Sequence, residues 1–291
     1  MNGVFHRLYY ALTEYKRKGE TTLILGAGCS LSSTIKDVST IGIMKESLYE
    51  HNIAIDDEKN WEDIYSNFIN VVWSGKTERE QRELLNKRFE GMTPTNAHKC
   101  LKNLIEAGYI NNIITTNFDL LIETVCEDMS YLKRTGDMGY SKHGNAEPKF
   151  NLLKVHGDLD SGILRFSPAE LMKLSPDLSN DINKKTQGLT IFIGYRGQDV
   201  GLMNSINCNS SSSMFWIDIS GPYNQNSYEA QKIINLLSAR ESLENVLSGK
   251  KFGDFNNILP ELNSILVLKN HKSIINAQKK HLISGWQDTS I

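Results

Sequence analysis

Polar side chains suited to acid–base and nucleotide chemistry follow two apolar runs of the chain. Asn117 and Asp119 come shortly after residues 110–115, and His156 comes directly after residues 152–155. A neutral imidazole can accept a proton from a water or a hydroxyl group, and amide and carboxylate side chains can orient either one. Taken alone, Asn117 and Asp119 favour a local turn that caps a helix, and His156 favours a structural histidine. These residues alone leave both interpretations open.

A glycine turn follows another apolar run, at residues 22–25. Gly26 and Gly28 lack the Cβ atoms that would keep a backbone away from a phosphate, and Ser30 can cap the next helix with its hydroxyl group. Free N–H groups would then face an anion. The third glycine of the dinucleotide-binding fingerprint is missing, because Leu31 stands in its place. The turn therefore predicts either a phosphate site or a purely structural bend.

The apolar runs are typical of buried parallel strands, since β-branched and apolar side chains follow one another without polar alternation. Strands are predicted at residues 22–25, 110–115, 152–155, 163–166, 190–193, 215–219 and 265–268. A helical stretch between the first two strands makes a βαβ crossover, which predicts an α/β fold with a Rossmann-like, doubly wound parallel sheet. Ligands of such sheets bind beyond the carboxyl ends of the strands. We therefore expect the polar segments to converge at one edge of the sheet.

Helical periodicity accounts for most of the remaining chain. Apolar spacing predicts a helix over residues 4–18 that ends at Gly19, and a helical insertion over about residues 35–108. Within the insertion, Thr93-Pro94 resembles a helix cap followed by proline at the first helical position. A further helix is predicted from residue 227 to about residue 247.

Composition predicts a globular protein without a strong electric field. The 291 residues are 40% hydrophobic, which is enough for a sizeable core, and 32 basic residues balance 34 acidic ones to a net charge of −2. Neither nucleic acid nor a membrane is expected as a partner. The four cysteines are scattered, which is typical of a cytoplasmic protein. We expect a nucleotide-binding domain over residues 1–221 and a mostly helical segment over residues 222–291, which could continue into a longer chain.

In chain order, Gly26-Ala27-Gly28-Cys29-Ser30, Thr115-Thr116-Asn117-Phe118-Asp119 and His156-Gly157-Asp158 resemble the motifs of the sirtuin family. Gly194-Tyr195 fits the family's fourth nucleotide-binding segment, so the resemblance spans roughly residues 20–220. Sirtuin deacylases carry two C-x-x-C pairs for structural zinc after the catalytic histidine, but no cysteine lies between His156 and Gly194. With these departures, the chain is similar to the sirtuin-like, NAD-consuming domains of bacterial anti-phage defence systems.

The resemblance implies a role for each candidate residue in cleaving the nicotinamide–ribose bond of NAD. Asn117 would orient the attacking water and the ribose, Asp119 would hold the nicotinamide carboxamide, and His156 would be the acid–base residue. Gly26, Ala27, Gly28 and Ser30 would hold the pyrophosphate; Gly194, Tyr195 and Asp218 would contact the adenosine half. A solvated strand-end carboxylate is an equal alternative for Asp218. Neither a metal nor a redox cofactor is implied.

The resemblance also implies a biological role, namely NAD depletion that aborts phage infection. It implies a homo-oligomer, and it is compatible with a partner sensor or activator protein. Two other functions stay open: a non-catalytic module that senses NAD or ADP-ribose, and a sirtuin-type deacylase or ADP-ribosyltransferase. The presence of both Asn117 and His156 favours the hydrolase.

Several further residues have two interpretations. Arg196 and Asp199 suit a ligand contact and a surface ion pair equally well, whereas Cys29 is more typical of packing than of chemistry. The aromatic stripe at Trp61, Tyr65 and Phe68 favours a core over a lid. The basic cluster Lys279-Lys280-His281 favours a solvated helix face over a binding patch.

Overall fold

The computed structural model describes residues 3–33, 40–55, 61–161, 164–165, 172–221 and 228–269. Its strands are β1 (Thr21–Leu25), β2 (Asn112–Thr115), β3 (Tyr131–Thr135), β4 (Ser141–His143), β5 (Asn151–Lys154), β6 (Leu189–Ile193), β7 (Met214–Ile217) and β8 (Val246–Leu247). They form one sheet in the order β4-β3-β5-β2-β1-β6-β7-β8. Every described neighbouring pair is parallel except β3 and β4. The predicted Rossmann-like α/β fold is confirmed.

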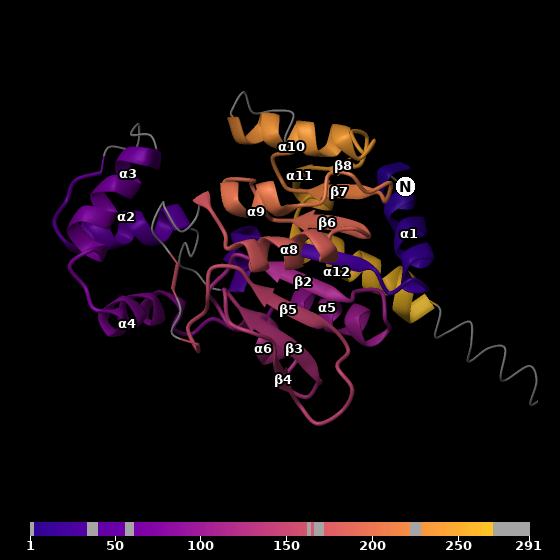
Figure 1. The fold of residues 1–291 in the computed structure, drawn as a ribbon, viewed down its shortest axis with the longest axis horizontal. Helices are drawn as coiled ribbons and strands as arrows, with labels where there is room; N and C mark the ends of the chain where they lie inside the picture. Colours follow the sequence, from indigo (N-terminus) through magenta and orange to yellow (C-terminus); the bar gives the residue numbers. More distant parts are fainter. Residues whose placement is uncertain are drawn as a thin grey trace, which may run out of the picture.

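Helices cover both faces of the sheet (Figure 1). One face shares a core with α1 (Gly3–Lys16), α5 (Asn96–Glu106) and α12 (Phe255–Asn263), and the other with α8 (Pro176–Lys185), α9 (Val200–Ser205) and α10 (Tyr228–Ala239). Within β1, Leu23 and Leu25 face the first core and Ile24 faces the second. Because the central strands are buried on both faces, they appear in the sequence as continuous apolar runs.

The strand order reverses at β1. The chain runs from β1 to β2 on one side and returns to β6 on the other side. The loops that follow β1 and β6 therefore leave adjacent strands in opposite directions, which is where ligands bind in open α/β sheets.

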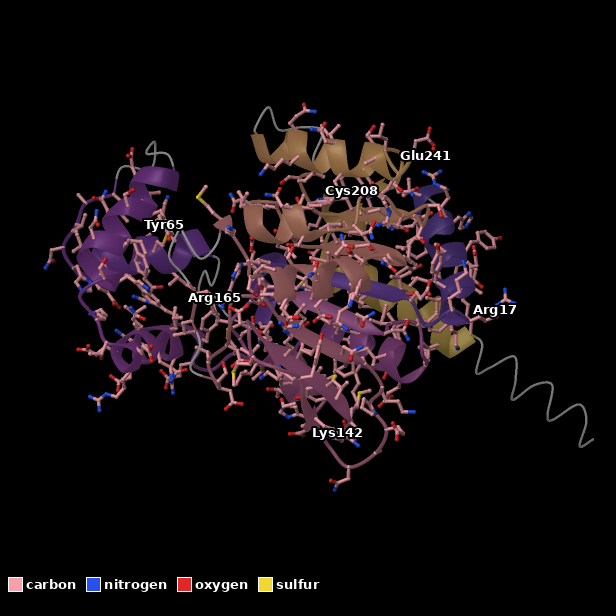
Figure 2. All side chains as sticks on the ribbon, in the orientation of Figure 1. Arg17, Tyr65, Lys142, Arg165, Cys208 and Glu241 are labelled. Carbon is pink, nitrogen blue, oxygen red and sulfur yellow. The ribbon has the colours of Figure 1, made fainter. Side chains whose placement is uncertain are left out.

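The insertion between β1 and β2 is helical in its described residues. It contains α2 (Thr40–Glu50), α3 (Trp61–Asn67), the π-helical turn η3 (Phe68–Trp73) and α4 (Glu78–Phe89), and it forms a lobe beside the sheet (Figure 1). Tyr65 and Phe68 are buried in the core of this lobe, as expected, and Tyr65 is marked among its side chains in Figure 2. Phe118, from the loop after β2, lies in the same core. The insertion thus packs directly against a predicted site loop.

The last described residues complete the same sheet and core. β8 pairs with β7, and α12 packs against α5. The predicted helix from residue 227 to about residue 247 is thus too long, because α10 ends at Ala239 and β8 follows it. No described helix is long and apolar enough to cross a membrane.

The structure also corrects the strand predictions at several places. The run predicted as a strand at residues 265–268 lies in the π-helical turn η5 (Ser264–Leu268), since a short apolar run fits a buried helix as well as a strand. The sequence reasoning missed β3 and β4; β3 carries buried basic residues, and β4 is a short edge strand. Two of the four residues of the predicted strand at 163–166 lie outside the described residues, and Leu164 makes only an isolated bridge with Gly157.

Two short helices lie in the connections from β2 to β3 and from β8 to α12. α6 (Leu121–Val125) follows the loop after β2, and α11 (Gly249–Phe252) precedes α12. The cap of α5 is Thr95 and not Thr93, so Pro94 lies before the helix. The basic cluster at residues 279–281 lies outside the described residues.

Candidate functional site

The glycine turn after β1 packs against the turn after β6. The Gly26 N–H donates to the Ile193 carbonyl at 3.1 Å, and the Gly28 N–H donates to the Gly194 carbonyl at 3.0 Å. A Cβ atom on Gly28 would lie 2.8 Å from the Gly194 Cα atom, and Gly194 itself has a φ of +61°. These glycines are therefore needed for the close approach of two loop backbones.

This packing changes the expectation of free N–H groups in the turn. The N–H groups of Cys29 and Ser30 donate at 3.0 Å to the carbonyls of Gly26 and Ala27, in addition to the two bonds just described. Only the Ala27 N–H lacks an acceptor within the described part of the turn. The expectation of free N–H groups is wrong at these four residues, since the N–H groups of Gly26 and Gly28 join β1 to β6 and those of Cys29 and Ser30 bond within the turn. A pyrophosphate contact by this turn stays a prediction.

Ser30 joins the first motif to the second. Its Oγ donates to the Asp119 Oδ2 atom at 2.7 Å and accepts from the Asn117 Nδ2 atom at 2.9 Å. The predicted role of Ser30 as a helix cap is therefore wrong, because its hydroxyl group bonds to the β2 loop instead. Only short 3₁₀ turns flank Ser30 in the described chain.

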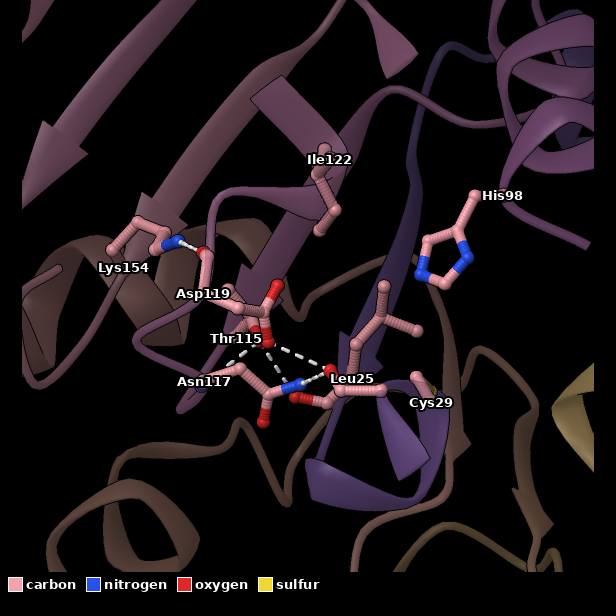
Figure 3. Close-up of a pocket in the computed structure, with 9 residues that line it drawn as sticks. Leu25, Cys29, His98, Thr115, Asn117, Asp119, Ile122 and Lys154 are labelled. Atoms are coloured by element: carbon pink, nitrogen blue, oxygen red, sulfur yellow. Dashed lines mark hydrogen bonds between the residues drawn. The ribbon is translucent and has the colours of Figure 1, made fainter. Parts of the chain in front are cut away.

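The amide orientation of Asn117 is fixed by these contacts (Figure 3). Its Nδ2 also donates to the Gly26 carbonyl at 3.1 Å, and a carbonyl can only accept. The Asn117 Oδ1 atom has no hydrogen-bond partner among the described residues, and the side chain is half-buried. The site thus presents an amide oxygen that can accept a hydrogen bond from a water or a hydroxyl group.

Asp119 has an internal role in the structure. Its Oδ1 accepts from the Leu121 N–H at 3.1 Å, which is the local capping turn considered from the sequence, while Oδ2 accepts from Ser30. The Asp119 backbone carbonyl accepts from the Lys154 Nζ atom. The side chain is only 4% exposed. Asp119 therefore supports the loop that carries Asn117, and its contact with nicotinamide stays a prediction.

His156 pairs with Asp199. The His156 Nε2 atom is hydrogen-bonded to the Asp199 Oδ2 atom, and the two side chains are only 4% and 9% exposed. The other ring nitrogen, Nδ1, is buried without a partner. Asp199 is thus paired inside the protein, whereas Arg196 is exposed and forms no ion pair within the described residues. Sequence reasoning placed Asp199 near the site but missed its pairing with His156.

A buried ionic network supports the same loops from β3 and β5. The Lys133 Nζ atom lies 3.0 Å from Glu123 and 2.7 Å from Asp158, and the Lys154 Nζ atom lies 3.2 Å from Glu123. Burial alone would raise the pKa of Asp158, but the hydrogen bond from Lys133 and the charge of Lys154 hold it below its usual value. Burial alone would lower the pKa of Lys133, but Glu123 and Asp158 raise it above its usual value. In the sequence, the signal for this network is a lysine within each of the two short strands β3 and β5.

The remaining nucleotide-site candidates lie at the ends of β6 and β7. The Tyr195 ring is buried and packs near Phe192 and Trp216, and burial raises the pKa of its hydroxyl group. The Tyr195 side chain therefore packs in the core, and its contact with the adenosine half stays a prediction. Asp218 is half-buried and accepts from the Ser220 N–H at 3.0 Å. Ligand contacts of Gly194 and Asp218 stay predictions.

A small cavity lies between the site loops and α5. It is lined by Ser30, Asn117, Asp119, Lys154 and His98 together with Thr115 and apolar neighbours, and its volume is about 10 Å³ (Figure 3). That volume suits about one water molecule and not a dinucleotide. No group of three or more His, Cys, Asp or Glu side chains in the described chain could hold a metal ion. Cys29 is buried, with its Sγ atom 3.2 Å from the Ile193 carbonyl, as expected of a packing residue.

His98, which lines this cavity, predicts a pH dependence of stability. The side chain is 2% exposed, and burial lowers its pKa from 6.5 to about 4 although the Asp119 charge opposes the shift. The folded protein keeps His98 neutral while the unfolded chain protonates it. About 3 kcal/mol of unfolding free energy should therefore be lost as the pH falls from about 6.5 to about 4.

Urea unfolding at several pH values between 7 and 4 measures this loss. The His98→Asn variant keeps an acceptor for the Thr95 N–H, which now donates to the His98 Nδ1 atom at 3.1 Å, and removes the titration. It should flatten the pH dependence, whereas the variant His6→Asn, at an exposed position, should not. Equal slopes in the wild type and in His98→Asn would refute this assignment.

The comparisons with known proteins found one family model and several solved structures that resemble this chain. Residues 111–237 match a family model described as a SIR2-like domain, whereas a search of curated proteins found no match. A structure on the mechanism and regulation of Sir2 enzymes is 11% identical, with a TM-score of 0.49, and covers 91% of this chain and 98% of its own. A Sir2 homologue variant in complex with ADP-ribose is 15% identical, with a TM-score of 0.48 and coverages of 90% and 95%. A Sir2 variant with a p53 peptide and NAD is 14% identical, with a TM-score of 0.42 and coverages of 87% and 96%. The match to the SIR2-like domain model runs from β2 into α10 and includes Asn117, His156 and Asp199.

Proposed function

We propose that the protein cleaves NAD to nicotinamide and to ADP-ribose or a cyclic product. The proposal rests chiefly on the contact between His156 and Asp199, which joins the loop after β5 to the loop after β6. Three strand spacings, about 14 Å, separate β5 from β6, and the strands between them are β2 and β1. The contact therefore supports a single site that contains the histidine, the Asn117 loop and the glycine turn.

The side chains of this site suit the reaction. In hydrolysis, the oxygen of a water bonds to the anomeric carbon while the bond to nicotinamide breaks, and its electron pair leaves with neutral nicotinamide. The Asn117 Oδ1 atom can accept a hydrogen bond from the water and so orient it, and His156 can accept the proton that the water loses. In a cyclisation, a second nucleophile of the same molecule takes the place of the water.

The wider role in our proposal is NAD depletion in anti-phage abortive infection. We place this role in the cytoplasm and assign it to a homo-oligomer that a partner sensor or activator protein switches on. The ordered motifs around Gly26, Asn117 and His156 support it by their resemblance to defence-system domains. The lack of cysteines between His156 and Gly194 disfavours a zinc-containing deacylase.

The test compares NAD binding with NAD turnover. Calorimetry measures binding, and chromatography measures nicotinamide release with and without an acetylated peptide. We expect release without the peptide, because the proposed nucleophile is water or the substrate itself. Tight binding without release, in the presence of the activator, would favour a sensor. Release only with the peptide would favour a deacylase.

A further inference from the structure

The pairing of His156 with Asp199 determines which ring nitrogen carries the proton. An ionised carboxylate can only accept hydrogen bonds, so the Nε2 atom that contacts Asp199 must be an N–H donor. In a neutral imidazole the other nitrogen, Nδ1, then carries the lone pair. The contact thus selects one of the two neutral tautomers.

The Nδ1 atom is the ring nitrogen of His156 that has no hydrogen-bond partner among the described residues. It is buried, and none of the described residues donates a hydrogen bond to it. Buried polar atoms in native proteins are nearly always bonded, and an exception needs an explanation. A hydroxyl group of a bound ribose or a bound water would satisfy an acceptor at this position.

We infer that Asp199 is a positioning residue for His156, fixing the Nε2–H tautomer so that Nδ1 is the atom that accepts the proton. The inference rests on the proposed function for its chemistry, but the tautomer itself can be measured without turnover. When Nδ1 takes the proton, the resulting imidazolium keeps its bond to the Asp199 carboxylate, which stabilises the positive charge. The proton comes from the attacking water or from a ribose hydroxyl group of NAD.

A purely structural role is the main alternative, because Asp199 also caps α9. Its Oδ1 atom accepts from the Leu202 N–H at 2.8 Å. Asparagine caps helices about as well as aspartate does. The variant Asp199→Asn therefore preserves the cap and removes the charged acceptor for Nε2, so it separates the two roles.

Asp254→Asn is the matched control. Asp254 caps α12 in the same way, with its Oδ1 atom accepting from the Asn256 N–H at 2.9 Å. We expect Asp199→Asn to lower the kcat for nicotinamide release by about 10²–10⁴-fold with little change in KM. Asp199→Glu should restore part of the loss, and Asp254→Asn should match the wild type. Wild-type kcat in Asp199→Asn would overturn the inference.

Nitrogen-15 NMR of the histidine side chains gives a readout that is independent of activity. The signal of His156 is assigned by its loss in His156→Gln. We expect the wild type to carry the proton on Nε2 alone, and Asp199→Asn to show a mixture of tautomers. A proton on Nδ1 in the wild type would overturn the inference. If the wild type releases no nicotinamide, the proposed function fails, and the NMR result still decides the role of Asp199.

Discussion

Asn117→Ala is expected to lower the rate of nicotinamide release by about 10²–10³-fold while leaving the protein folded. The variant removes the Oδ1 atom, which has no partner among the described residues and which we propose orients the attacking water. It also removes the two Nδ2 bonds to Gly26 and Ser30, at 3.1 and 2.9 Å, which should cost about 1–3 kcal/mol of unfolding free energy. Initial rates at saturating NAD measure the first effect, and urea unfolding measures the second.

Asn145→Ala provides the control for this prediction. Asn145 is exposed in the described structure and lies outside the site. It should leave both the rate and the stability unchanged. A rate for Asn117→Ala within a factor of two of the wild type would show that the free amide oxygen takes no part in the reaction.

Phe118→Ala is expected to impair both stability and activity. Phe118 lies between Asn117 and Asp119 in the chain, is 8% exposed, and belongs to the core of the helical insertion. Removing a buried phenylalanine ring costs about 3–5 kcal/mol. Because the ring anchors the Asn117 loop to the insertion, its loss should also displace the Asn117 amide and lower the rate per folded molecule.

Phe89→Ala separates these two effects. Phe89 is 9% exposed and packs in the same core, but it comes from the end of α4 and not from a site loop. It should show a comparable loss of stability by urea unfolding. Its rate per folded molecule should stay near the wild type. Equal rates per folded molecule for the two variants would contradict a coupling between the insertion and the site.

The centre of the sheet could be predicted because its strands are buried on both faces. Leu23, Ile24 and Leu25 face alternate cores, so the whole run is apolar and stands out in the sequence. β3 could not be recognised in this way, because Lys133 and Arg134 interrupt its apolar pattern. Their burial depends on acidic partners that tertiary structure brings to them, as Lys133 shows with Asp158.

The candidate site could be predicted only in part, for a related reason. The motifs mark the strand ends, and a parallel sheet brings such ends together. The pairing of His156 with Asp199 spans 43 residues and depends on the order of β5, β2, β1 and β6, which local patterns do not encode. A glycine sequence likewise cannot tell whether the missing Cβ makes room for a phosphate or for another backbone. Gly28 makes room for Gly194.

The most direct test of the central claim is the product balance of the purified protein with NAD, followed by chromatography without any acylated peptide. The proposed activity predicts nicotinamide and ADP-ribose, or its cyclic form, in equal amounts, and neither product with Asn117→Ala or His156→Ala. NAD that stays intact with the activated wild type, or equal turnover by the wild type and His156→Ala, would contradict the proposal.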